Sequence, residues 1–161
     1  MKKRNETVLF FELKYGLCSV EDVIAWADEK IELEDNPSIE VIELSVAEPK
    51  SKDHLLSLLN PMLPTSDQFE LIKIYVPYLL EDIYTKKIKV RDAERLTYDF
   101  IRCHYEKIPD GLWGLFAIDD DFDMAEDGTY GSLKKVENEY IKILESIKAE
   151  QSRTNRSTEC R

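Results

Sequence analysis

Apolar residues recur every three to four positions along most of this chain, and this spacing limits its fold more than any other feature. In the stretch from residue 23 to residue 31, Val23, Trp26, Ala27 and Ile31 fall on one face of an α-helix. The same period continues near the end of the chain in Leu133, Val136, Tyr140, Ile143, Leu144 and Ile147. Short helices are marginal on their own and must bury such faces against one another. The pattern therefore predicts a helical protein from Val8 to Lys148.

Turn-forming residues divide this pattern into seven or eight helices. Gly16 is suited to end the first helix, and Ser19 is suited to cap the second. The segment NPMLPTSD is a clear break that ends in a further cap candidate, Asp67. Pro77 lies inside a long amphipathic stretch, where it predicts a kink or a split near Tyr75.

One segment leaves the choice between helix and strand open. Residues Ile39–Val46 include β-branched side chains, but their alternation is incomplete and their neighbours are helical, which favours helix. Short connections favour antiparallel helical hairpins. We therefore expect an all-α fold, either a compact multi-helix bundle or a short α-solenoid. Residues 1–150 are expected to form a single domain, and residues 151–161, which lack core side chains, a flexible tail.

The charge of the chain narrows the classes of partner. The formal net charge is -11, and basic residues gather at both ends, so the region between them is more acidic still. Binding to nucleic acid or to anionic lipid requires Lys and Arg opposite phosphates. We therefore expect neither nucleic acid nor a membrane as partner, and a basic protein or a cation instead. The oligomeric state does not follow from the sequence.

Three widely spaced cysteines indicate reduced thiols. Cys18, Cys103 and Cys160 form no CxxC pair, and their number is odd. No apolar run approaches the roughly 20 residues of a membrane span, and the N-terminus lacks the features of a signal peptide. These observations predict a cytoplasmic protein.

The segment AIDDDFDMAEDGTYGS, Ala117–Ser132, is the most unusual part of the sequence. It contains six carboxylates and no basic residue: Asp119, Asp120, Asp121, Asp123, Glu126 and Asp127. Pro109, Gly111 and Gly114 precede it and predict that regular structure ends there, so we expect the segment to be a loop. Like charges at this density repel each other unless a positive group meets them.

Neither calcium binding nor catalysis explains the acidic segment. If an EF-hand began at Asp119, its sixth position would be Met124 instead of Gly and its twelfth Tyr130 instead of Glu. Exposed aspartates also lack the unequal burial that separates the pKa values of a catalytic pair. The two histidines, His54 and His104, show no metal-ligand or nucleophile–base spacing, and no nucleotide-binding or hydrolase motif is present. We expect no cofactor and no catalytic activity.

Binding of a protein partner remains as the main hypothesis. Aspartates on a loop can steer a basic partner, and aromatic residues can anchor it. We expect Trp113 and Phe116 to pack in the core, whereas Phe122 and Tyr130 can either hold the loop or contact the partner. The candidate partner-binding residues are Asp119, Asp120, Asp121, Phe122, Asp123, Glu126, Asp127 and Tyr130.

The stretches LKYGLCSVEDVIAWADEKI, NPSIEVIELSVAE and HLLSLL carry a loose family resemblance. Together with the late segment DGTYGS before a final helix, they resemble the all-helical immunity proteins of bacterial polymorphic or contact-dependent toxin systems. The likeness extends over residues 9–148. It implies a protein that binds and blocks a cognate toxin, often a basic nuclease, and that has no catalytic residues. Two alternatives stay open: a helical adaptor or regulator with another protein partner, and a metal-dependent enzyme.

Overall fold

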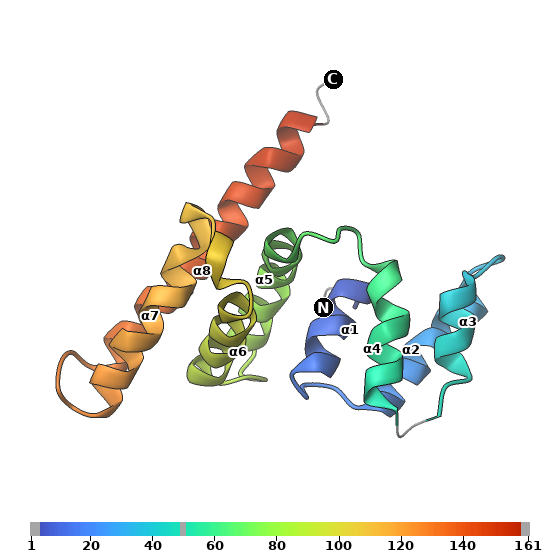
Figure 1. The fold of residues 1–161 in the computed structure, drawn as a ribbon, viewed down its shortest axis with the longest axis horizontal. Coiled ribbons are helices and arrows are strands. Elements are labelled where there is room, and N and C mark those ends of the chain that lie inside the picture. Colours follow the sequence, from blue (N-terminus) through green and yellow to red (C-terminus); the bar gives the residue numbers. More distant parts are fainter. Residues whose placement is uncertain (1–3, 49–50, 159–161) are drawn as a thin grey trace. The chain divides into compact units, whose positions relative to one another are not determined.

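The computed structural model describes residues 4–48 and 51–158, and its regular structure is entirely helical (Figure 1). Eight α-helices and two short 3-10 helices are present in these residues, and no strand is found among them. The all-α prediction is confirmed, and the ambiguous segment forms helix α3 (Ile39–Ser45). The helices fall into two compact units that divide between Ser66 and Asp67. Each unit has its own core, and the single domain expected over residues 1–150 stays a prediction.

The N-terminal unit contains α1 (Glu6–Lys14), α2 (Val20–Leu33), α3 and α4 (Lys52–Leu59), followed by the 3-10 turn η1 (Asn60–Met62). Helix α1 packs against α4 and α2, and α3 packs against α2 and α4. All residues from Thr7 to Leu13 are buried, so α1 is covered on all its faces.

Three predicted helix boundaries are confirmed in detail. Gly16 follows α1 with a φ of 72°, in the left-handed region that glycine enters most readily. The Ser19 hydroxyl accepts a hydrogen bond from the Asp22 N–H, and the Asp22 carboxylate accepts one from the Ser19 N–H. This reciprocal pair forms a capping box at the start of α2. The Asp67 carboxylate caps the next unit's first helix by accepting from the N–H groups of Phe69 and Glu70.

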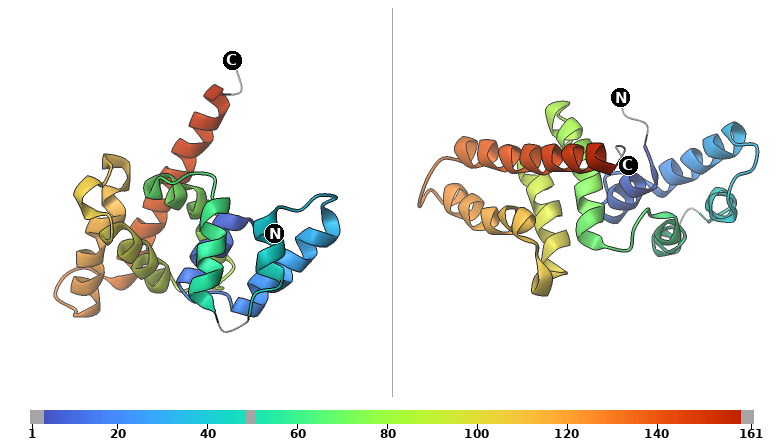
Figure 2. Two further views of the ribbon diagram at one scale, coloured as in Figure 1. Left: turned by 45° about the vertical axis from the view of Figure 1, so that its right-hand side comes forward. Right: turned by 90° about the horizontal axis from the view of Figure 1, so that it is seen from above.

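The C-terminal unit contains four longer helices and one short turn. These are α5 (Gln68–Tyr84), α6 (Val90–Arg102), the 3-10 turn η2 (Tyr105–Lys107), α7 (Asp110–Glu126) and α8 (Leu133–Thr158). Helix α7 packs between α6 and α8, and α8 also contacts α5 and α6 (Figure 2). Pro77 lies within α5, which continues through it, so the possible split near Tyr75 does not occur.

The expectation of an acidic loop is wrong, because residues 119–126 belong to α7. Pro109 precedes the first helical residue, where its missing N–H removes no intrahelical hydrogen bond. Gly114 faces α8 inside this helix, and a Cβ on Gly114 would lie 3.4 Å from the Ile143 side chain, an ordinary contact. The apolar period that stabilises this helix is carried by four buried residues, Leu112, Leu115, Ile118 and Phe122.

The flexible tail expected over residues 151–161 stays a prediction, because the helical assignment of its described residues does not test whether they are mobile. Helix α8 continues through Gln151 to Thr158, where a flexible segment was expected. Its last turns extend beyond the other helices of the C-terminal unit (Figures 1 and 2). An existing helix adds a residue at little cost, so α8 can continue without new core contacts. Residues 159–161 lie outside the described part of the chain.

Gly16 and Gly114 differ in backbone conformation, so substituting each by alanine should change the stability of the protein in opposite directions. Gly16→Ala places a Cβ on a residue with φ of 72° and should destabilise the protein by about 1 kcal/mol. Gly114→Ala lies inside α7, where a Cβ makes an ordinary contact with Ile143, and should stabilise it by roughly 0.5–1 kcal/mol. Urea unfolding of both variants measures the two changes. Destabilisation by both substitutions would contradict the helical assignment at Gly114.

Candidate functional site: the Arg91 cluster and the outer face of α7

A single arginine from α6 meets the acidic segment on one side of α7. Arg91 lies close to Asp119 (Nη1 to Oδ1, 2.9 Å), Asp123 (Nη2 to Oδ1, 2.5 Å) and Glu126 (Nε to Oε1, 3.2 Å), and Nη1 also contacts Glu94 of its own helix. The spacing 119, 123, 126 places the three α7 carboxylates on one helical face. Burial opposes the charge on Arg91, but the bond to Asp119 and the charges of Glu94 and Glu126 outweigh it and raise the pKa of Arg91.

Phe122 forms the floor of this Arg91 cluster instead of a contact surface. Its side chain is fully buried, and the Arg91 guanidinium carbon lies 4.9 Å from the ring centroid. On its other side the ring meets the ring of Tyr140 on α8 edge to face, with 6.2 Å between centroids. Contact of Phe122 with a partner stays a prediction; within the structure its ring contacts Arg91 of α6 and Tyr140 of α8, so it joins α6, α7 and α8.

Glu94 is the most unusual carboxylate of the Arg91 cluster, because its side chain is completely buried. Burial raises its pKa to about 7; Asp119 adds to this effect, and Arg91 opposes it. Its Oε1 atom has no hydrogen-bond partner among the described residues. Nearby, the Thr97 and Tyr140 hydroxyls lie 3.0 Å apart, and burial raises the pKa of Tyr140, which keeps that hydroxyl protonated. Glu94 is therefore a group that can change its charge near neutral pH.

Other carboxylates in and just after α7 lie at helical positions that Arg91 does not reach. Asp120 and Asp121 are exposed, as is Asp127 at the end of the helix, and among the described residues these three side chains form no ion pair. Tyr130 follows in the turn before α8 and is 72% exposed. Negative charge near the C-terminal end of a helix is also unfavourable to the helix dipole. This outer face of α7 thus holds negative charge that no ion pair among the described residues offsets.

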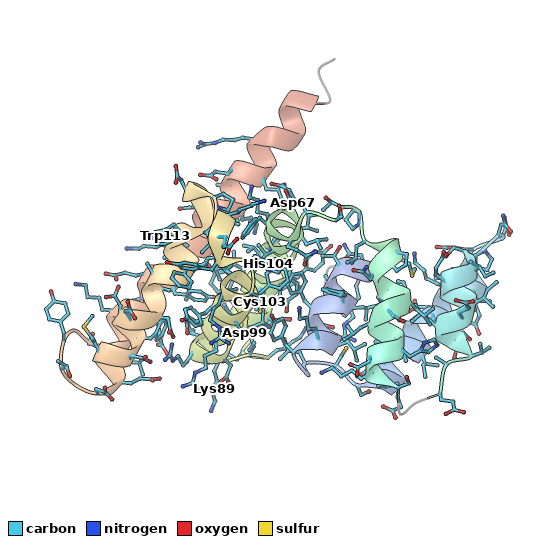
Figure 3. All side chains as sticks on the ribbon, in the orientation of Figure 1. Asp67, Lys89, Asp99, Cys103, His104 and Trp113 are labelled. Atoms are coloured by element: carbon cyan, nitrogen blue, oxygen red, sulfur yellow. The ribbon has the colours of Figure 1, made fainter. Side chains whose placement is uncertain are left out.

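Four aromatic side chains gather between α6, η2 and the first half of α7. Tyr98 stacks on Phe116 with 5.2 Å between centroids, and Phe116 also lies near Tyr105 (5.2 Å) and Trp113 (5.4 Å). Tyr105 is 55% exposed and Trp113 is 46% exposed. We call Tyr98, Tyr105, Trp113 and Phe116 the aromatic patch. The expectation that Trp113 lies in the core is wrong: it projects from the first turns of α7 (Figure 3).

The cysteine and histidine side chains of the described residues form no metal site. Cys18 and Cys103 are free thiols, and burial together with Glu12 raises the pKa of Cys18 to about 12, so it remains a protonated thiol. His54 is exposed, whereas His104 Nδ1 lies 3.0 Å from the Phe100 carbonyl oxygen. Within residues 4–48 and 51–158, no group of three or more His, Cys, Asp and Glu side chains could hold a metal ion. In the same residues, no helix is both long and apolar enough to cross a bilayer.

Sequence reasoning missed the Arg91 cluster because its cation lies 28 residues before Asp119. The helical period of the buried residues of α7 was the available signal, since it places Asp119, Asp123 and Glu126 together and Asp120 and Asp121 elsewhere.

Comparisons with family models, curated proteins and solved structures found no match.

Arg91 and Arg95 provide a matched test of how much the cluster contributes to stability. Arg91→Met leaves several carboxylates around a mostly buried position, with only 13% of the Arg91 side chain exposed, and should cost about 3–5 kcal/mol. Arg95 is 61% exposed and reaches Glu126 only at 3.9 Å, so Arg95→Met should cost less than about 1 kcal/mol. Thermal and urea unfolding measure both. Equal, small losses would show that the cluster does not stabilise the fold.

The buried Glu94 carboxyl should make stability depend on pH in a defined direction. Its pKa is about 7 in the folded protein against an ordinary value of 4.5, so the folded state holds the proton to higher pH than the unfolded chain does. Stability contributed by the protonated group is present at low pH and is lost as pH rises from 4.5 to about 7. The slope of this loss approaches about 1.4 kcal/mol per pH unit.

Glu94→Gln should remove this slope, because glutamine stays neutral throughout. The variant should match the parent protein near pH 4.5 and be more stable at pH 8. Urea unfolding at several pH values gives the difference between the two proteins, in which contributions from other groups cancel. An unchanged slope in the variant would assign the pH dependence to another residue.

Proposed function

We propose that this protein binds a basic toxin domain and neutralises it. The observation that carries the proposal is the outer face of α7, where Asp120, Asp121 and Asp127 are exposed and form no ion pair among the described residues. Such charges weaken the free protein slightly through mutual repulsion and through the helix dipole. A positively charged partner would remove both costs on binding.

The nature of the partner follows from charge and from the family resemblance. An acidic surface repels nucleic acid and anionic lipid and raises the association rate of basic proteins. The immunity proteins that the chain resembles block toxins that are often basic nucleases. Inhibition then requires no catalytic group on this chain: it covers the basic surface with which the toxin would hold its own anionic substrate.

The direct test uses the genomic neighbour as the probe. We expect the gene immediately upstream to encode a large secreted protein with a variable C-terminal region. Expression of that C-terminal domain in a laboratory bacterium should stop growth, and co-expression of this protein should restore it. A toxic domain that this protein neither binds nor neutralises would overturn the proposal.

Two pairs of neutralising substitutions locate the surface that steers the partner. Asp120→Asn with Asp121→Asn should slow association with the toxin domain and flatten its salt dependence, because steering is a long-range effect screened within roughly 10 Å at 0.1 M salt. Stability should change little, because both side chains are exposed and form no ion pair among the described residues. Stopped-flow binding over a range of salt concentrations measures the rates.

The matched control removes the same charge from helix α2. Glu29→Gln with Glu32→Gln neutralises two exposed carboxylates of the other unit and should leave the association rate closer to that of the parent protein. If this pair slows association and the α7 pair does not, the steering surface lies on α2. Asp119 and Asp123 are unsuitable for this comparison, since they bind Arg91 and their loss acts on stability.

A further inference from the structure

We infer that the aromatic patch is the anchoring surface for an arginine-bearing segment of the basic partner. This inference rests on the proposed function, because it assigns the contact that follows electrostatic steering. The patch belongs to the same helix as the outer carboxylates: Asp120 lies one turn after Phe116 on α7. The carboxylates that would steer a partner and the aromatic rings that would contact it therefore lie next to each other on α7.

The composition and exposure of the aromatic patch fit a contact surface better than a core. The ring of Phe116 contacts the other three rings and is partly covered by them, whereas Tyr105 and Trp113 each keep about half of their surface in solvent. Tyrosine and tryptophan are the residues most enriched among those that dominate binding energy. The described helices leave about half of each of these two side chains exposed, so a partner could bury the rest.

Carboxylates border the patch and define the charge of what it can bind. Asp110 lies one turn before Trp113 on α7, and Glu106 follows Tyr105 in η2. Asp99, labelled in Figure 3, follows Tyr98 on α6 and already accepts a hydrogen bond from Arg102. An apolar segment without charge would leave these carboxylates beside a newly dry surface, which is unfavourable. A cationic side chain could contact the aromatic rings and pair with the carboxylates at the border of the patch.

The protein already contains one example of the contact that we infer. The Arg102 guanidinium carbon lies 5.9 Å from the Tyr98 ring centroid, and Arg102 Nη2 donates to Asp99 Oδ1 at 3.1 Å. One edge of the patch thus holds a guanidinium between a ring and a carboxylate. Arginine suits such a position better than lysine, because its planar group stacks on rings while its N–H groups still bind carboxylate oxygens.

The two tryptophans allow the inference to be tested without the toxin. The probes are hexa-arginine and hexa-lysine peptides of equal charge, titrated at low salt into the full chain labelled with ¹⁵N. The indole N–H signal of Trp113 should shift. The signal of Trp26 should not, because Trp26 is buried and its Nε1 donates to the Arg4 carbonyl oxygen at 3.3 Å. Trp113→Phe assigns the two signals.

We expect hexa-arginine to bind roughly two- to fivefold more tightly than hexa-lysine, as an exposed cation–π contact allows. Tyr105→Ala should remove this preference while leaving the weaker, charge-driven binding. Tyr130→Ala is the matched control, since Tyr130 is an exposed tyrosine outside the patch and should keep the preference.

Each outcome of the peptide titration decides the inference independently of the proposed function. Equal affinities for the two peptides, or a shift of the Trp113 signal that persists unchanged in Tyr105→Ala, would overturn the assignment of the patch. Failure of the growth-rescue experiment alongside a clear arginine preference would instead reject the toxin as partner and retain the arginine-binding surface.

Discussion

The contact between Arg91 and the carboxylates of α7 is the interaction on which the C-terminal unit depends. Three α7 side chains approach one guanidinium that belongs to α6, and the guanidinium lies over the buried ring of Phe122. Without the cation, the inward face of α7 would hold several like charges beside an apolar core. A mostly buried arginine is costly to desolvate, and several carboxylates together offset that cost better than one could.

This interaction separates the acidic segment into two faces with different physical roles. Asp119, Asp123 and Glu126 lie toward Arg91, so its single positive charge offsets part of their charge within the fold. Asp120 and Asp121 emerge between them at the helical spacing and keep their full field in solvent. A run of carboxylates that looks uniform in the sequence thus combines a stabilising group with exposed carboxylates that form no ion pair among the described residues. The buried Glu94 makes the strength of the first group depend on pH.

Helix ends and caps, which depend on neighbouring residues, were predictable from the sequence. Contacts between residues far apart in the chain were not. Gly16, Ser19 and Asp67 act through hydrogen bonds or backbone angles within a few residues, so their roles follow from the residue type and its neighbours. The start of α7 was missed because proline and glycine favour turns locally, while packing against α8 decides the outcome there. The partner of the acidic segment was missed because Arg91 has no local feature that distinguishes it from other arginines.

The arrangement on α7 also accounts for why charge and aromatic rings occur together near its surface. Charge acts over a distance comparable to the screening length and sets how fast a partner arrives, but an exposed charge pair contributes little to how long it stays. Aromatic contacts act only at touching distance and mainly slow dissociation. The outer carboxylates alone would attract many basic proteins without selecting among them. In the proposed complex, the adjoining aromatic patch would add a shape and a preference for the planar guanidinium, and specificity for one basic partner would require this second contribution.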